Sequence, residues 1–177
     1  MGPLVPVVLV EAGIFRGESL AVWTDVLPPS ATVIGVDGNV SPFAHALPKL
    51  YQRGAFRSGT PRVIQGTSVQ AAARIANASV TLFIDDAGHS PRAQIDTFGA
   101  WRGKMRWGDE ATYIIEDIIN MPLVRGTLAR LDPALHFCSH GYLAILYARA
   151  VPINDCANWC VRNCAKSTRC GHCERRH

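Results

Sequence analysis

The sequence of 177 residues predicts an α/β fold, in which helices cover both faces of a mostly parallel β-sheet. Short apolar runs alternate with amphipathic stretches over the first 150 residues, and this alternation is typical of parallel strands joined by helices. The last two apolar runs are separated only by a tight turn, so the strands that they form must be antiparallel. The length fits one domain of about 100–200 residues with its own core.

The predicted elements alternate from the start of the chain. Val7–Glu11 is a β-branched, apolar run that suits a strand buried on both faces. The next stretch, Gly17–Leu27, carries apolar residues at helical spacing and stops before Pro28. The later elements follow in order: strand Thr32–Asp37, helix Pro42–Gln52, strand Arg62–Gln65, helix Ser68–Ala76, strand Ser79–Asp85, helix Pro91–Arg102, strand Thr112–Glu116 and helix Leu123–Leu131.

Two further strands, Leu135–Ser139 and Tyr142–Arg149, are expected around a turn at His140-Gly141. They would form an antiparallel C-terminal hairpin on a doubly wound sheet of the Rossmann-like kind. We therefore expect a domain over residues 1–150, followed by a short Cys-rich tail over residues 151–177.

The formal charge of +4 is concentrated in this tail, which carries five basic and two acidic side chains, whereas residues 1–150 carry 13 and 12. A nearly neutral body argues against a large phosphate-binding face, so nucleic acid is expected to bind at most the tail. No apolar run approaches the roughly 20 residues that span a bilayer, and no membrane partner is expected. The apolar start lacks the basic region of a signal peptide, which favours a cytoplasmic location.

Polar residues follow each predicted strand, where ligands bind in open α/β sheets. The first strand ends in Glu11, and Gly13 and Gly17 then allow a tight turn and close approach of the backbone to a ligand. Their spacing differs from the G-x-G-x-x-G of dinucleotide enzymes. Asp37 ends the second strand, where an acid can accept both hydroxyls of a ribose, although an ordinary loop aspartate is the alternative.

Four carboxylates and an imidazole follow the fourth and fifth strands: Asp85, Asp86, His89, Glu116 and Asp117. Crowded like charges repel unless a cation or protonation relieves them, and oxygen ligands of this kind suit Mg²⁺. His89 would stand beside the metal as a general base near neutral pH. Alternatively, Asp85 or Asp117 caps a helix and His89 is an ordinary loop residue.

Two segments of the chain resemble a known family. FIDDAGHSPRAQIDTF (residues 83–98) followed by YIIEDI (residues 113–118) is similar to the IDDGSH…F…YVIEDL signature of magnesium-dependent sugar O-methyltransferases from macrolide biosynthesis, a family that includes cephalosporin hydroxylase-like proteins. VEAGIFRGESL (residues 10–20) is similar to the first motif of that family. The resemblance covers about residues 7–120 and implies a class I S-adenosylmethionine-dependent methyltransferase.

The resemblance also implies roles for individual residues. Asp86, Glu116 and Asp117 would hold Mg²⁺, and His89 would be the base that activates a hydroxyl of a small molecule, a sugar or vicinal diol. The residues expected to contact S-adenosylmethionine are Glu11, Gly13, Gly17, Ser19, Asp37, Gln65, Gly66, Thr67 and Asp85. The chain departs from the pattern at Ala87, where the family has glycine, and at Thr67, where it has an acid.

Three other interpretations stay open. The first keeps the fold and the cofactor but takes a catechol or another vicinal diol as the acceptor, since two metal-bound oxygens need not belong to a sugar. The second is a nucleic-acid-associated binding module, in which the basic tail docks on RNA or DNA and the domain is a degenerate methyltransferase scaffold. The third concerns assembly, because a second subunit could complete the site of so short a domain, which would make the protein a homo-oligomer.

The tail has a cysteine pattern of its own. Cysteines four apart fall on one face of a helix, and a Cys-x-x-Cys element has the spacing of structural zinc sites. Zn²⁺ binding, disulfides in an exported protein and an unmetallated basic tail are the three hypotheses, which metal analysis with thiol counting would separate. The candidate zinc ligands are Cys156, Cys160, Cys164, Cys170 and Cys173.

Overall fold

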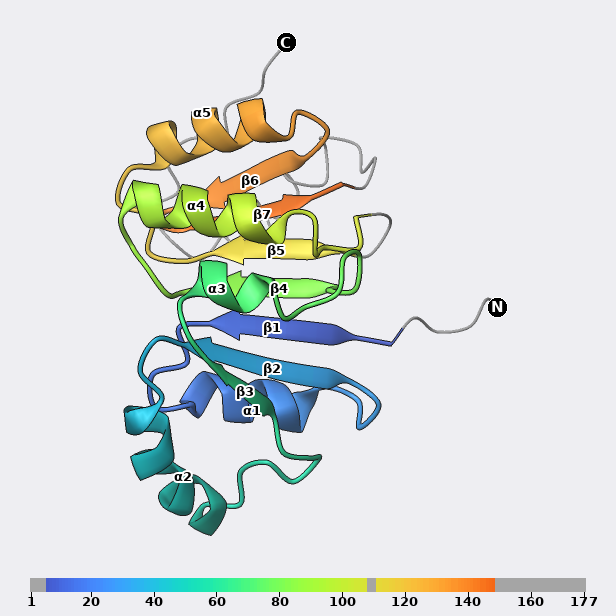
Figure 1. The fold of residues 1–177 in the computed structure, drawn as a ribbon, viewed down its shortest axis with the longest axis vertical. Helices are drawn as coiled ribbons and strands as arrows, with labels where there is room; N and C mark the ends of the chain where they lie inside the picture. The colour runs from blue at the N-terminus through green and yellow to red at the C-terminus, as the bar shows by residue number, and fades with distance from the viewer. Residues whose placement is uncertain (1–5, 108–110, 149–177) are drawn as a thin grey trace, which may run out of the picture.

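The computed structural model describes residues 6–107 and 111–148, which form a seven-stranded sheet of order β3-β2-β1-β4-β5-β7-β6 (Figure 1). The strands are β1 (Val8–Ala12), β2 (Thr32–Asp37), β3 (Arg62–Gln65), β4 (Leu82–Asp85), β5 (Thr112–Ile115), β6 (His136–His140) and β7 (Leu143–Tyr147). The helices are α1 (Glu18–Val26), α2 (Ser41–Gln52), α3 (Ser68–Ala72), α4 (Pro91–Trp101) and α5 (Met121–Leu131).

The first five strands pair in parallel, and β7 lies antiparallel between β5 and β6. This confirms the predicted parallel sheet with its antiparallel C-terminal hairpin. Because β1 pairs with both β2 and β4, the strand order reverses at β1. Ligands bind at such a switch point in open α/β sheets.

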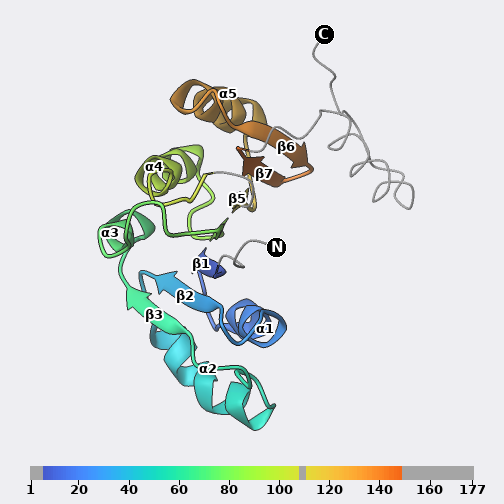
Figure 2. The same ribbon diagram turned by 90° about the vertical axis from the view of Figure 1, so that its right-hand side faces the viewer.

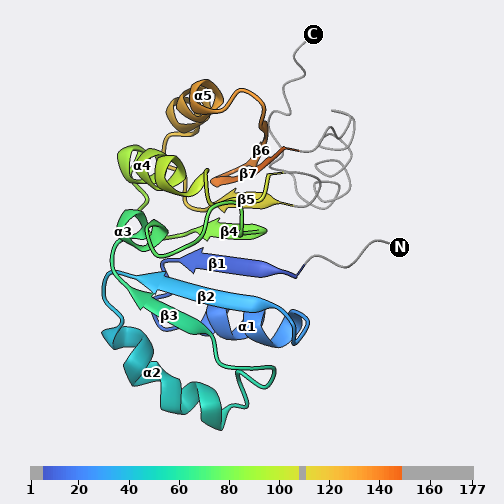
Figure 3. The same cartoon turned by 45° about the vertical axis from the view of Figure 1, so that its right-hand side comes forward.

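Helices cover both faces of the sheet, so the doubly wound prediction is also confirmed. Figures 2 and 3 show α3, α4 and α5 on one face and α1 on the other, with α2 beyond the β3 end. Alternate strand residues face the two layers, as the pleat requires. Val10 packs with the α3–α5 side, whereas its neighbour Leu9 packs with α1 and α2.

The core beneath α4 is aromatic and holds the helix in place. The ring of Phe83 on β4 lies 4.4 Å from that of Trp101 and 4.7 Å from that of Tyr113, measured between centroids. The indole N–H of Trp101 donates to the hydroxyl of Ser68 at 2.9 Å, which satisfies a buried donor and ties α4 to α3.

Helix α3 is four residues and strand β4 three residues shorter at one end than the sequence predicts, whereas the ends of the other elements lie within two residues of the predicted ones. Helix α3 ends at Ala72, since the following backbone tightens into i→i+3 turns that place Ile75 in the core. Strand β4 begins only at Leu82, because Val80 forms an isolated bridge with Met105 outside the sheet. Both differences arise from tertiary contacts that no local pattern encodes.

None of the helices in the described part of the chain is long and apolar enough to span a membrane. The candidate zinc ligands Cys156, Cys160, Cys164, Cys170 and Cys173 lie outside the described residues, as does the predicted boundary at residue 150.

Candidate functional site

The carboxyl ends of the five parallel strands lie along one edge of the sheet, as the sequence predicts. Ala12 on β1 is in register with Asp85 on β4, and Asp85 is in register with Ile115 on β5. The residues that follow these positions therefore lie side by side along this edge.

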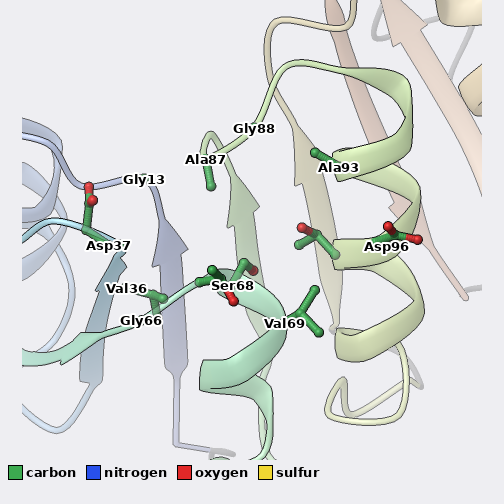
Figure 4. Close-up of a pocket in the computed structure, with 13 residues that line it drawn as sticks. Gly13, Val36, Asp37, Gly66, Ser68, Val69, Ala87, Gly88, Ala93 and Asp96 are labelled. Atoms are coloured by element: carbon green, nitrogen blue, oxygen red, sulfur yellow. The ribbon is translucent and has the colours of Figure 1, made fainter.

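A cavity of about 450 Å³ opens at this edge, between the β1–β2 side and α4 (Figure 4). A volume of this size is typical of small-molecule sites. Its wall includes Ala87 after β4 and Asp96 on α4. Four of the residues predicted to contact the cofactor also line it: Gly13, Asp37, Gly66 and Thr67.

Asp37 anchors the loop that follows β1. Its carboxylate accepts hydrogen bonds from the backbone N–H groups of Phe15 and Asn39, each at 2.9 Å. The first of these bonds holds Phe15 at a φ of 43°, a left-handed conformation that costs energy in a bulky residue. Each carboxylate oxygen can accept more than one hydrogen bond, so Asp37 can still receive the hydroxyls of a ribose.

Gly13 is required because the β1 loop runs against the segment that follows β4. Its φ is +95°, and an added Cβ would lie 2.1 Å from the carbonyl oxygen of Asp86. Gly17 has a φ of +80°, and a Cβ there would lie 2.4 Å from the ring of Phe43. Both glycines thus permit close packing of the protein on itself, and at Gly13 this packing forms the cavity wall.

The other predicted cofactor residues are not part of the cavity lining, and two of them are buried acids. Glu11 is 2% exposed and accepts a hydrogen bond from the Ser19 hydroxyl, and burial raises its pKa to about 7. Asp85 accepts a hydrogen bond from the Tyr113 hydroxyl at 3.3 Å, and burial raises its pKa to about 7 as well. Gly17 and Gln65 are also outside the lining.

We expect the Glu11→Gln substitution to change how stability depends on pH. The folded protein holds the proton of Glu11 up to about pH 7, whereas the ordinary pKa is 4.5. The contribution of Glu11 to the free energy of unfolding is therefore fully present below pH 4.5, and roughly 3 kcal/mol of it is lost as the pH rises to 7. Glutamine cannot ionise, so urea unfolding of the variant between pH 5 and pH 8 should show a smaller fall, of which the part due to Asp85 remains. Equal pH slopes in the two proteins would contradict the expectation.

Asp86, His89 and Asp117 form the acid–histidine cluster. One ligand atom from each lies within 4.8 Å of the others, and His89 Nδ1 is 3.9 Å from Asp117 Oδ2. Burial raises the pKa of Asp86, and Asp117 raises it further, while His89 lowers it. Burial raises the pKa of Glu116 too, followed by the charges of Asp86 and Asp117. Glu116 is thus close to the cluster, but His89 is the residue whose ligand atom lies within 4.8 Å of those of Asp86 and Asp117.

Neither Asp85 nor Asp117 caps a helix. The N-cap of α4 is Ser90, whose hydroxyl accepts from Ala93 N–H, and that of α5 is Asn120. The structure therefore excludes helix capping as the reason for Asp85 and Asp117 in the sequence.

The turn that carries Asp117 is held from three sides, which explains its left-handed φ of 51°. Glu116 N–H donates to the carbonyl of Asp85 at 3.0 Å, and Ile118 N–H donates to that of Tyr142 at 2.8 Å. The third contact comes from Gln94 on α4, which is 1% exposed and donates to the Glu116 carbonyl at 2.9 Å. Gln94 was not predicted. The only signal in the sequence is a glutamine on the face of α4 that Phe98 and Trp101 bury.

A sheet of this order, with a cavity over Gly13 and Asp37 at the switch point, defines a Rossmann-like protein with a nucleotide-type ligand site. Residues 10–118 match the family described as "Methyltransferase domain", and the chain belongs to this family. The protein is therefore a class I S-adenosylmethionine-dependent methyltransferase.

Solved structures show the same fold at low identity. A putative rRNA methylase from Clostridium thermocellum is 14% identical with a TM-score of 0.62, and the match covers 81% of this chain and 88% of that one. A putative O-methyltransferase from Klebsiella pneumoniae is 16% identical with a TM-score of 0.60, covering 81% and 73%. TomG, an O-methyltransferase from Streptomyces achromogenes involved in tomaymycin synthesis and solved with S-adenosylmethionine, is 15% identical with a TM-score of 0.59, covering 79% and 72%. None of the curated proteins matches the sequence.

Proposed function

We propose that the protein is a Mg²⁺-dependent O-methyltransferase acting on a hydroxyl of a small molecule, a sugar or vicinal diol. The observation that carries this proposal is the acid–histidine cluster at the same strand edge as the cofactor cavity. A methyltransferase needs a methyl acceptor next to its cofactor, and this cluster combines groups that bind a cation with a group that accepts a proton.

The residues of the cluster fit a divalent cation. Asp86 and Glu116 both have raised pKa values, because burial and neighbouring carboxylates disfavour their charged forms. A cation would relieve this repulsion, and hard carboxylate oxygens are the ligands that Mg²⁺ prefers. Asp86 and Asp117 would hold it, with Glu116 beside them.

S-adenosylmethionine supplies the methyl group, and Mg²⁺, when bound, would lower the pKa of the acceptor hydroxyl. The protein's own residues do the rest. Asp37 would bind the ribose, and the loop at Gly13 would shape the wall beside it. His89, whose Nδ1 lies 3.9 Å from Asp117 Oδ2, would accept the hydroxyl proton.

The alternative, a nucleic-acid module on a degenerate scaffold, is not favoured. The acids that catalysis would need are gathered in one place. Carboxylates that repel one another destabilise the fold, and a scaffold without catalytic function would gain nothing that offsets this cost.

Calorimetric titration of the full chain with S-adenosylmethionine, with and without Mg²⁺, tests the proposal. We expect binding in both conditions, because the cavity and the cluster use different residues, and methyl transfer only with Mg²⁺. Absence of binding in both conditions would overturn the proposal. Methyl transfer that continues in the presence of a chelator would show that the protein is a methyltransferase that does not need Mg²⁺, and the metal part of the proposal would be wrong.

A further inference from the structure

The left-handed backbone of Asp117 decides where its carboxylate lies. Asp117 has a φ of 51° and contributes one of the three ligand atoms of the acid–histidine cluster. Aspartate tolerates this conformation better than most residues, but the conformation still costs energy. The contacts that hold this φ therefore determine whether the carboxylate stays within reach of Asp86 and His89.

Three consecutive peptide groups around Asp117 are hydrogen-bonded, and a side chain holds the middle one. Glu116 N–H and Ile118 N–H, on the outer two, donate to backbone carbonyls at 3.0 and 2.8 Å. The middle group joins Glu116 to Asp117, and its carbonyl accepts from Nε2 of Gln94 at 2.9 Å. Rotation of this group changes φ of Asp117 directly. A substitution at Gln94 can therefore release the group without altering the turn itself.

We propose that Gln94 is a positioning residue for the acid–histidine cluster, because its hydrogen bond fixes the peptide group before Asp117 and so keeps the Asp117 carboxylate beside Asp86. The inference rests on the proposed function, in which these two carboxylates hold Mg²⁺. Without the bond, the peptide group is free to turn over and give Asp117 an ordinary negative φ. The carboxylate would then leave the place where it shares a cation with Asp86.

The surroundings of Gln94 favour this role over one in packing. Gln94 is 1% exposed and lies on the side of α4 that also buries Phe98 and Trp101, where an apolar residue would be ordinary. Within residues 6–107 and 111–148, its Oε1 atom has no hydrogen-bond partner, and a buried acceptor without a partner lowers stability. The amide therefore disfavours folding on its oxygen side, and its nitrogen side supplies the bond to the turn.

Helix α4 is held in place by contacts that do not involve Gln94. The indole N–H of Trp101 donates to the Ser68 hydroxyl at 2.9 Å, and the ring of Phe98 packs edge-on against that of Tyr113, with 5.3 Å between centroids. Loss of the Gln94 amide should thus leave the helix where it is and release only the turn. A group that orients a metal ligand in this way typically contributes a factor of roughly 10–100 to metal affinity.

The test measures the affinity of the full chain for Mn²⁺, followed by electron paramagnetic resonance, which requires neither an acceptor nor turnover. Gln94→Met keeps the length and bulk of the side chain but cannot donate a hydrogen bond. We expect the Kd for Mn²⁺ to rise roughly 10- to 100-fold. The affinity for S-adenosylmethionine should stay close to that of the wild type, because Gln94 does not line the cofactor cavity. If Gln94→Met does not fold, Gln94→Asn, whose amide is one methylene shorter, carries the same expectation.

Phe98→Leu is the matched control, since it removes packing from the same helix without touching the turn. It should lower the free energy of unfolding in urea and leave Mn²⁺ affinity unchanged. Gln94→Met should show the reverse, a weakened Mn²⁺ site with little change in stability. Wild-type Mn²⁺ affinity in Gln94→Met, or an equal loss of affinity in Phe98→Leu, would overturn the positioning role.

Failure of the proposed function would look different. Asp86→Asn, measured in parallel, shows how much Mn²⁺ binds the chain outside the cluster. If this variant bound Mn²⁺ as tightly as the wild type, the cluster would not be the metal site, and both the proposed function and the role of Gln94 would be wrong. If only Asp86→Asn lost affinity and Gln94→Met kept it, the metal site would stand and the positioning role alone would fall.

Discussion

Replacement of His89 by alanine is expected to slow methyl transfer by about 100-fold or more, because positioned general bases contribute roughly 10²–10⁴ to enzymatic rates. The imidazole is half-exposed at the mouth of the site, with Nδ1 turned toward Asp117. His89 does not line the cofactor cavity, so the affinity for S-adenosylmethionine should stay close to that of the wild type. Single-turnover transfer from labelled S-adenosylmethionine, together with calorimetry, measures the two quantities separately.

The same variant distinguishes a base from a metal ligand. His89 is close enough to Asp86 and Asp117 to share a cation with them. Mn²⁺, which is visible by electron paramagnetic resonance, can report on the metal in place of Mg²⁺. If His89 is the base, His89→Ala keeps Mn²⁺ affinity and loses only the rate, whereas a ligand would lose both.

A histidine outside the cluster provides the control. His45 on α2 bonds through Nδ1 to the carbonyl of Ser41, and His45→Ala should leave both transfer and Mn²⁺ binding unchanged. Wild-type turnover in His89→Ala would remove the assignment of the base.

The fold could be predicted because local patterns and topology agree along most of the chain. The bounds of β2 and β3 match the predicted ones, since polar residues and turns punctuate both apolar runs. The start of α5 at Met121 was missed by two residues, although Asn120 and Pro122 are good signals for a helix N-terminus. The bounds of α3 and β4 depend on where Ile75 and Val80 pack, which only the tertiary structure determines.

The site could be predicted only as far as strand ends determine it. The rule that ligands bind beyond the carboxyl ends of parallel strands brings Gly13, Asp37, Asp86 and Asp117 to one edge, and the structure places them there. It does not reveal Gln94, which reaches the Asp117 turn only because α4 packs over β5. The hydrogen bond from Ile118 N–H to the Tyr142 carbonyl could not be predicted either, since it depends on how the hairpin turn meets the end of β5.

Asp86→Asn is expected to reduce methyl transfer by roughly 1000-fold, because a bound cation that polarises a reacting oxygen contributes several kcal/mol to catalysis. Asparagine has nearly the same shape as aspartate, so the substitution removes the charge and keeps the packing. Mn²⁺ binding by electron paramagnetic resonance should fall with activity. Chelation of the wild type with EDTA should stop transfer as well, and added Mg²⁺ should restore it.

The stability of the metal-free variant should move in the opposite direction. Burial and the charge of Asp117 raise the pKa of Asp86, which means that the folded protein disfavours its ionised form. Ionisation of this carboxylate therefore costs the folded wild type free energy, whereas the variant carries no charge at this position. The free energy of unfolding of metal-free Asp86→Asn, measured in urea at pH 8, should therefore exceed that of the wild type.

A gain in stability together with a loss of activity is the signature of a residue retained for its chemistry. Glu18→Gln is the matched control, because it removes an exposed carboxylate that follows β1 at the same edge of the sheet without touching the cluster. It should change neither transfer nor Mn²⁺ binding. If Asp86→Asn kept wild-type transfer, the carboxylates would have no catalytic role. If it lost stability along with activity, Asp86 would instead support the fold, and the metal would have to be sought elsewhere.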